Sequence, residues 1–250
     1  MAKKKCYEFV PKSVYGPYLN RAFGLVQKVV KKLNASGIRS TCYLIGSAGK
    51  RHMVTRLVID GVAQAFDVDI NIEIDITCLP KKYRDLKALK EHIRVELNHS
   101  ISETCEFFSD GSNSTSVISC PLHYNDGGSS KVEFSFDVGI VSRNSAGNLQ
   151  RLIANKQKDL YTWAKIKNSS SLDDHVKLIL EQNLWNELRD RYLKTKNRLI
   201  NDENTPSFVC YKIAVEEVFQ LIVTPRKEVK KSKYKRPKNW DPVGDSAMDD

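Results

Sequence analysis

The sequence has few of the residues that mark secreted, thiolate-metal or membrane proteins. Its six cysteines are scattered and form no C-x-x-C pair, so a zinc or redox motif is not indicated and the thiols are expected to be reduced. The five histidines fall in no ligand spacing. The apolar runs are far shorter than the roughly 20 residues of a membrane helix, and the basic N-terminus lacks a secretory apolar stretch. We therefore expect a cytoplasmic protein without a membrane partner.

The charge is unbalanced, at +10 over 250 residues, which favours polyanionic partners. Part of it is segregated near the C-terminus, where a basic run over 226–238 precedes an acidic end over 241–250. Neither segment has an apolar period, so a flexible tail is predicted over 225–250. The basic run is either a solubilising tail or a contact for a phosphate backbone or a protein partner, and the sequence leaves both open.

The apolar pattern divides the chain into two parts. The first alternates helices with strands and glycine-rich turns, whereas the pattern after Gly147 is helical. We therefore predict an α+β fold, with a mixed-sheet core over 1–147, a helical domain over 148–224 that can close a cleft over the core, and the tail. The predicted helices are 14–33, 81–99, 149–165, 173–199 and 207–223, and the predicted strands are 39–45, 54–59, 66–76, 105–108, 116–122 and 131–142.

Residues 66–76 alternate strictly between apolar and acidic or amide residues, the two-residue period of a β-strand. Asp67 and Asp69 therefore share a face, about 7 Å apart, with Glu73 and Asp75 further along and no Lys or Arg between them. Two carboxylates 4 Å apart repel by about 4 kcal/mol at an effective dielectric constant of about 20. The cluster calls for a cation, and Mg²⁺ (or Mn²⁺) suits it because carboxylates and substrate phosphates hold that ion together. Glu73 and Asp75 can compete for the metal, but a solvated edge is the favoured interpretation of them.

A third carboxylate, Asp137, lies in the middle of the apolar strand 131–142. A lone buried carboxylate is costly unless it is paired or coordinates something. If this strand neighbours the acidic one, Asp137 completes a triad with Asp67 and Asp69. Three carboxylates around one or two Mg²⁺ ions suit phosphoryl transfer, and Asp137 can also act as the general base for an attacking hydroxyl.

Gly46 and Ser47 directly follow the strand 39–45. Glycine permits a sharp turn there and lets backbone N–H groups approach a phosphate, and the serine hydroxyl adds a hydrogen bond. Lys50, shortly after, adds a cation. Alone, such a turn has little specificity; a plain turn is the more frequent explanation.

With the Gly-Ser turn, the Asp-Val-Asp strand and the later aspartate, residues 40–142 resemble the nucleotidyltransferase superfamily with the polymerase-beta fold. The resemblance implies transfer of a nucleoside monophosphate from an NTP, with ATP the expected donor, and release of pyrophosphate. It also implies that Gly46 and Ser47 hold the triphosphate, and that Asp67, Asp69 and Asp137 are catalytic and bind metal. The interval from Ser47 to Asp67 is longer than is usual in the family, which predicts an extra hairpin near residues 54–61.

The helical half supplies further candidates for binding the NTP. Arg189, Tyr192 and Lys196 are spaced three and four apart and so share a helix face. The cations can reach a triphosphate and the tyrosine can stack on a base. Tyr211 and Lys212, on the next predicted helix, are candidates for the same two roles. The alternative for each is a solvated helix face.

The acceptor hydroxyl is the open question. The positive charge favours RNA or an oligonucleotide as acceptor. A small-molecule or nucleotide acceptor is the main enzymatic alternative, and a cyclic or linear oligonucleotide signal is among the products that the family makes. The alternative of another class is a catalytically silent module that binds nucleic acid or is regulated by a partner. A broken triad is the signature of such a module, and all three aspartates are present here.

Overall fold

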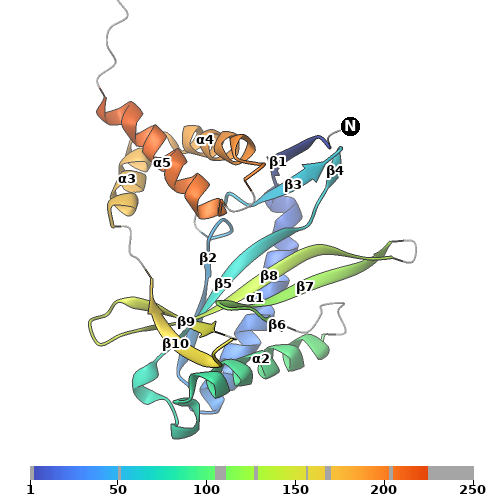
Figure 1. Ribbon diagram of the computed structural model, residues 1–250, viewed down its shortest axis with the longest axis vertical. Coiled ribbons are helices and arrows are strands. Elements are labelled where there is room, and N and C mark those ends of the chain that lie inside the picture. Colours follow the sequence, from blue (N-terminus) through green and yellow to red (C-terminus); the bar gives the residue numbers. More distant parts are fainter. Residues whose placement is uncertain are drawn as a thin grey trace, which may run out of the picture.

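In the computed structural model a mixed β-sheet carries two helices on one face and a cluster of three helices at one end (Figure 1). The structure describes residues 3–49, 52–104, 111–126, 129–155, 157–166, 170–202 and 205–224. Lys50, the predicted strand 105–108 and the predicted tail over 225–250 lie outside these residues. Among the described residues, no helix is both long and apolar enough to cross a membrane.

The strands are β1 (Lys5–Phe9), β2 (Ser40–Ile45), β3 (Thr55–Ile59), β4 (Val62–Ala63), β5 (Phe66–Ile74), β6 (Ser112–Asn113), β7 (Val117–Asp126), β8 (Ser129–Arg143), β9 (Leu149–Asn155) and β10 (Leu160–Lys165). The helices are α1 (Lys12–Ala35), α2 (Leu86–Ser102), α3 (Ser170–Glu181), α4 (Trp185–Arg198) and α5 (Ser207–Val223), with short 3₁₀ turns η1 (Ile76–Cys78) and η2 (Lys81–Tyr83).

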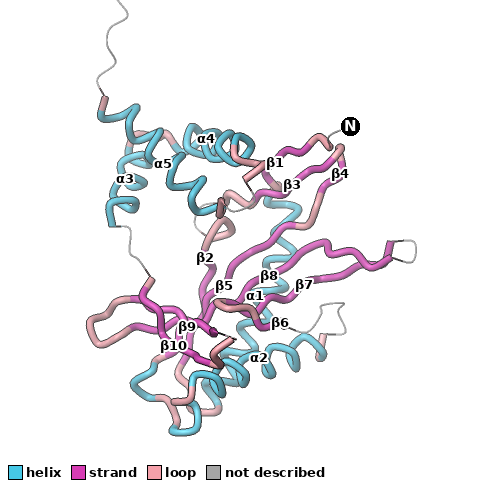
Figure 2. The backbone as a smooth tube through the Cα atoms, in the orientation of Figure 1, coloured by secondary structure: helices cyan, strands magenta, loops and turns pink. Residues whose placement is uncertain are grey.

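The larger sheet has seven strands, of which five follow the order β10-β9-β8-β5-β2. Strand β5 is parallel to β8 and antiparallel to β2, and the long strand β8 also pairs with β7. Figure 2 shows β2, β5, β8 and β7 side by side. In the β5–β8 register Asp69 lies opposite Asp137. The two strands that carry the predicted carboxylates are therefore neighbours.

The two faces of β5 differ as its alternating sequence predicts. Val68, Ile70 and Ile72 are fully buried on one face, in a core that includes residues of α1 and α2. Each such side chain contributes about 1.5–3 kcal/mol on burial. The other face carries Asp67, Asp69 and further polar residues. The helices that cover the apolar face thus leave the polar face for a ligand.

Helices α3, α4 and α5 enclose a second, smaller core that contains Leu188, Tyr192 and Val215. Strand β1 docks on α4 through Asn197, whose side-chain amide accepts a hydrogen bond from the Tyr7 nitrogen (2.6 Å) and donates one to the Tyr7 carbonyl (3.1 Å). The smaller sheet, in the order β1-β3-β4, therefore lies beside the helical cluster (Figure 1).

The predicted α+β class is confirmed: the chain forms a mixed sheet followed by helices. The hairpin predicted near residues 54–61 is also present, as β3 and β4 around Gly61 at φ +82°. The predicted helix over 149–165 is wrong, because those residues form the antiparallel pair β9 and β10. Their alternate residues Leu152 and Ala154 are buried, and Asp159 takes the left-handed φ of +48° at the turn. The helices after the sheet therefore begin only at α3.

Two other predicted helices have different boundaries in the structure, for local reasons. The predicted helix 173–199 is broken into α3 and α4 at Asn183, which has a φ of +56°. The helix predicted from residue 81 begins at α2, because the Asp85 side chain caps it by accepting from the Lys87 nitrogen. Strand β1 was not predicted.

Candidate functional site

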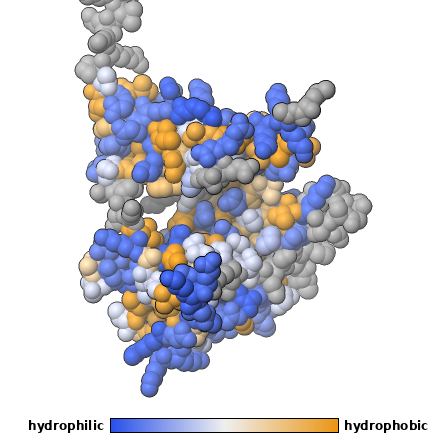
Figure 3. Space-filling view, in the orientation of Figure 1, coloured by the Kyte–Doolittle hydropathy of each residue, from blue (hydrophilic) through white to orange (hydrophobic). Residues whose placement is uncertain are grey.

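A pocket of about 150 Å³ lies between the polar face of the sheet and the helices α4 and α5. On the face seen in Figure 3 the surface is hollowed between the helical cluster and the sheet below it. Residues from five separate segments line the pocket: Gly46, Ser47, Met53, Thr55, Asp67, Asp69, Tyr192, Lys196, Ser207, Phe208 and Tyr211. Seven of these were candidates from the sequence: Gly46, Ser47, Asp67, Asp69, Tyr192, Lys196 and Tyr211.

The turn after β2 brings its backbone against the acidic strand. Gly46 has a φ of +62°, and a Cβ built on it would lie 2.5 Å from Oδ2 of Asp69. Any other residue would therefore meet both an unfavourable backbone conformation and the carboxylate. The Ser47 carbonyl accepts a hydrogen bond from the Met53 nitrogen (2.8 Å), which closes the loop. The expected turn is thus built, and it lies at the carboxylates.

The three aspartates lie on neighbouring strands and influence one another. Asp67 is exposed, whereas Asp69 is partly buried. Burial, and then the negative charges of Asp67 and Asp137, raise the pKa of Asp69 to about 6, although the positive charge of Arg151 lowers it. Burial and the charge of Asp67 also raise the pKa of Asp137, although the Ser119 hydroxyl, which donates to Oδ1 at 2.6 Å, opposes that rise. The site thus concentrates negative charge in a half-buried position.

The carboxylate oxygens of this site are suitable ligands for a divalent cation, but they are not arranged as a complete metal site. Within the part of the chain that the structure describes, no three His, Cys, Asp or Glu side chains are grouped closely enough to hold a metal ion. The Asp69 carboxylate lies against Gly46, and the Asp137 carboxylate accepts a hydrogen bond from the Ser119 hydroxyl. Carboxylate oxygens are nevertheless the ligands that Mg²⁺ prefers, and a cation would relieve the repulsion that raises the pKa of Asp69.

Lys196 is the cation of the helical side of the pocket. It is 8% exposed, and its Nζ donates to Oγ1 of Thr55 (2.8 Å) and Oγ of Ser207 (3.0 Å). Its ammonium also lies 4.1 Å from the centre of the Tyr7 ring. Burial lowers the pKa of Lys196, while the charge of Asp67 raises it. Neutral hydroxyls hold this ammonium, so its charge remains available to an anion in the pocket.

Aromatic side chains form the wall of the pocket on α4 and α5. Tyr192 is buried, and burial is the main reason that its pKa rises to about 12, so the phenol remains neutral. Phe208, at the start of α5, is 51% exposed although it lines the pocket. It was not among the predicted residues, and neither were Met53, Thr55 and Ser207. An aromatic residue just after the helix-opening Pro206 is a signal that could have pointed to it.

Three other predicted residues are not among those that line the pocket: Asp137, which lies opposite Asp69 on β8, and Arg189 and Lys212 on the helices. Arg189 is not among the lining residues, and its guanidinium carbon lies 4.6 Å from the centre of the Phe9 ring. Lys212 is exposed on α5 and does not line the pocket. Tyr211, its neighbour, does line it.

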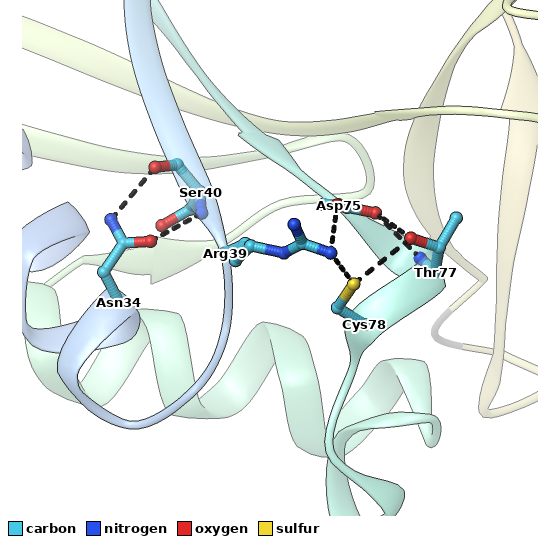
Figure 4. Close-up of polar contacts among 6 residues, drawn as sticks. All are labelled: Asn34, Arg39, Ser40, Asp75, Thr77 and Cys78. Atoms are coloured by element: carbon cyan, nitrogen blue, oxygen red, sulfur yellow. Dashed lines mark hydrogen bonds and ion pairs between the residues drawn. The ribbon is translucent and has the colours of Figure 1, made fainter.

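The remaining carboxylates of the acidic strand have partners of their own. Figure 4 shows Asp75 accepting from the Thr77 nitrogen (3.0 Å) and hydroxyl (2.6 Å) and paired with Nη2 of Arg39 (3.1 Å), which also contacts the Cys78 sulfur. Glu73 accepts from Nε of Arg143 at 2.9 Å. These pairs lie at the end of β5 away from Gly46, outside the pocket lining.

No protein-family model matches the sequence, and no curated protein matches it. Among solved structures, CdnC of Escherichia coli MS115-1 with ATP is 15% identical with a TM-score of 0.47, and the match covers 83% of this chain and 60% of that one. DncV of Vibrio cholerae with 3'-deoxy ATP is 10% identical with a TM-score of 0.49, over 72% and 45% of the two chains. The CD-NTase CdnG of Bradyrhizobium diazoefficiens with GTP is 15% identical with a TM-score of 0.42, over 66% and 42%. The chain thus spans less than two thirds of the length of these proteins.

Proposed function

We propose that the protein is a metal-dependent nucleotidyltransferase that moves a nucleoside monophosphate from an NTP to a hydroxyl acceptor and releases pyrophosphate. The observation that carries the proposal is the single pocket that joins the Gly46-Ser47 turn, the Asp67 and Asp69 carboxylates and the Lys196 ammonium. Each feature alone is common. Together they match the parts of an NTP and the charge that develops on it during transfer.

The donor would bind across the pocket. The triphosphate fits the turn, where backbone N–H groups and the Ser47 hydroxyl can donate to phosphate oxygens, and Lys196 can pair with it from the other side. Phe208 and Tyr211 offer aromatic faces for the base. Lys196 would also stabilise the charge on the departing pyrophosphate.

Asp67, Asp69 and Asp137 would hold Mg²⁺ or Mn²⁺, which neutralises the triphosphate and lowers the pKa of the attacking hydroxyl when bound. Asp137 has a raised pKa and therefore suits a general base that takes the hydroxyl proton. The acceptor oxygen then forms a bond to the α-phosphorus while the bond from that phosphorus to the oxygen of the leaving pyrophosphate breaks. The proton remains on Asp137 until it passes to solvent.

The test is transfer of label from each of the four α-labelled NTPs with Mg²⁺ or Mn²⁺, with either an RNA oligonucleotide or unlabelled nucleotides as acceptors. Asp67→Ala and Asp69→Ala remove the candidate catalytic groups, and Asp75→Asn, directly after the same strand, is the matched control. Label that moves in the wild type and the control but not in the two alanine variants supports the proposal.

The destination of the label identifies the acceptor, because labelled RNA and labelled soluble oligonucleotides separate by size. If no label moves with either metal, while RNA binding survives both alanine substitutions, the protein is instead a silent binding module of this fold.

A further inference from the structure

The segment that carries the Gly46-Ser47 turn ends at a residue with an unusual backbone conformation. His52 has a φ of +47°, in the left-handed region that residues other than glycine adopt infrequently. Three other described residues besides glycine have a positive φ: Asp60, Asp159 and Asn183. Each of those three lies in a short turn that joins two consecutive helices or strands, and Asp and Asn tolerate this conformation best. His52 instead lies next to Met53, which lines the candidate pocket.

The conformation of His52 returns the chain to the turn. The nitrogen of the following residue, Met53, donates to the Ser47 carbonyl at 2.8 Å and so joins the end of the loop to its beginning. Ala48 and Met53 are 2% and 1% exposed, so both ends of the loop are fixed by packing. Strained backbone of this kind persists only where the surrounding structure holds it. His52 is therefore the position at which the shape of the loop is maintained.

A side chain of helix α1 contacts His52. The Tyr15 hydroxyl and Nδ1 of His52 lie 3.0 Å apart and share a hydrogen bond. Tyr15 is 1% exposed, and its backbone nitrogen donates to the Pro11 carbonyl at 3.1 Å in the first turn of α1. Burial raises the pKa of Tyr15 although the charge of Arg189 lowers it, so the hydroxyl keeps its proton at neutral pH. A buried and fixed group thus holds the imidazole, which is itself exposed.

We propose that His52 is a positioning residue for the donor triphosphate, because its left-handed backbone and its hydrogen bond with Tyr15 keep the Gly46-Ser47 turn in place; this inference rests on the proposed function. Backbone N–H groups bind a phosphate most tightly when they are already oriented, since a loose loop must first lose conformational freedom. His52 is not among the residues that line the pocket, so it acts through Met53 and Ser47.

Two substitutions remove the hydrogen bond from its two sides. Tyr15→Phe keeps the ring and removes the hydroxyl, whereas His52→Gly removes the imidazole and keeps the left-handed conformation accessible. Each variant should raise the KM for NTP about three- to tenfold, the equivalent of one hydrogen bond, while kcat stays within about twofold. The double variant should lose no more than His52→Gly alone, because both substitutions remove the same interaction.

A rescue variant and a control separate positioning from stability. Asparagine tolerates a positive φ, and its side-chain amide offers a polar atom to the Tyr15 hydroxyl, so His52→Asn should keep the KM within about twofold of the wild type. Asn183→Gly is the matched control, because Asn183 has a φ of +56° and does not line the pocket. Thermal melting of all variants runs in parallel. A lower melting temperature or kcat at an unchanged KM would show that the contact only supports the fold.

A second readout needs no turnover. Calorimetric binding of α,β-methylene-ATP with Mg²⁺ should weaken about three- to tenfold in Tyr15→Phe and His52→Gly, but not in His52→Asn or Asn183→Gly. If the wild type transfers nucleotide and both test variants keep its KM and its affinity for the analogue, this inference alone is wrong. If the wild type transfers no nucleotide but this binding pattern appears, the proposed function fails and the positioning role stands. If the wild type neither transfers nucleotide nor binds the analogue, both fail.

Discussion

The two ends of β5 carry the same sequence pattern and differ in their surroundings. At one end Asp67 and Asp69 face a pocket formed with the Gly46-Ser47 turn and Lys196. At the other end Glu73 and Asp75 are paired with Arg143 and Arg39 (Figure 4 for Asp75). Charge on the strand is therefore neutralised by the protein at one end and left to a ligand at the other.

The difference arises from neighbouring segments, which the alternation of β5 does not report. Arg39 immediately precedes β2 and Arg143 ends β8, so both arginines reach the same end of the sheet. Near Asp69, by contrast, burial and the charges of Asp67 and Asp137 outweigh the effect of Arg151. A carboxylate with a raised pKa is a stronger indication of function than one that has its own arginine.

The largest expected contrast between the two ends is in activity. Asp67→Ala or Asp69→Ala should reduce nucleotide transfer on the order of a thousandfold or more, because each removes charge from the place where the phosphates react in the proposed function. Asp75→Asn should keep the rate within about twofold. The measurement is initial transfer rate at saturating NTP and metal. Equal losses at both ends of the strand would contradict the division.

A second contrast separates the two cations predicted on α4. Lys196→Met should raise the KM for NTP by about 10- to 100-fold, the equivalent of one lost charge-assisted hydrogen bond. Arg189→Met should change it less than about threefold, because Arg189 lies over Phe9 and not in the pocket. Thermal melting of both variants, run in parallel, separates a loss of binding from a loss of fold. A larger KM effect at Arg189 would mean that the pocket closes differently around the donor.

Stability should change in the opposite direction from activity at Asp69. Its folded pKa of about 6 lies above the ordinary value of 3.8, so the folded state holds the proton more tightly and loses stability as pH rises from about 4 to 6. Asp69→Asn should therefore stabilise the protein at pH 7, by up to about 3 kcal/mol, and raise its melting temperature. The gain should vanish below pH 4.

Mg²⁺ tests the same pKa shift. It should raise the melting temperature of the wild type at pH 7 more than that of Asp69→Asn, because the proposed metal site uses the ionised Asp69 carboxylate. A destabilised Asp69→Asn protein at pH 7 would show that Asp69 makes a structural contact that outweighs its charge.

The sequence was most informative where a period or a turn residue determines structure locally. The alternation of β5, helix α5 and the glycine turn at residue 46 could all be predicted because neighbouring residues determine them. The strands β9 and β10 were mistaken for a helix because their apolar residues fit both periods, and only pairing with β8 decides between them. Strand β1 is short, and long-range contacts with β3 and α4 hold it in place.

The candidate site shows the same division. Gly46, Ser47, Asp67 and Asp69 could be predicted as neighbours in the pocket because each pair is contiguous or has a two-residue spacing, whereas the position of Asp137 opposite Asp69 depends on the pairing of β5 with β8. Thr55, Ser207 and Phe208 could not, because they reach the pocket from segments far apart in the sequence. Lys196 and Arg189 share a helix face in the sequence, but β1 packs beside that face and takes Arg189 out of the site.

The smallest expected effect is at Asp75, and it concerns stability alone. Its hydrogen bonds with the Thr77 side chain and backbone lower its pKa below 3.8, so its contribution to stability is present above that pH and is lost in acid. Asp75→Ala should therefore lower the melting temperature by a few degrees at pH 7, and the difference from the wild type should disappear as the pH falls through the lowered pKa. Transfer activity should stay close to that of the wild type. Melting curves between pH 2 and 7 measure the effect, and a loss of activity without a loss of stability would mean that both ends of β5 serve the ligand.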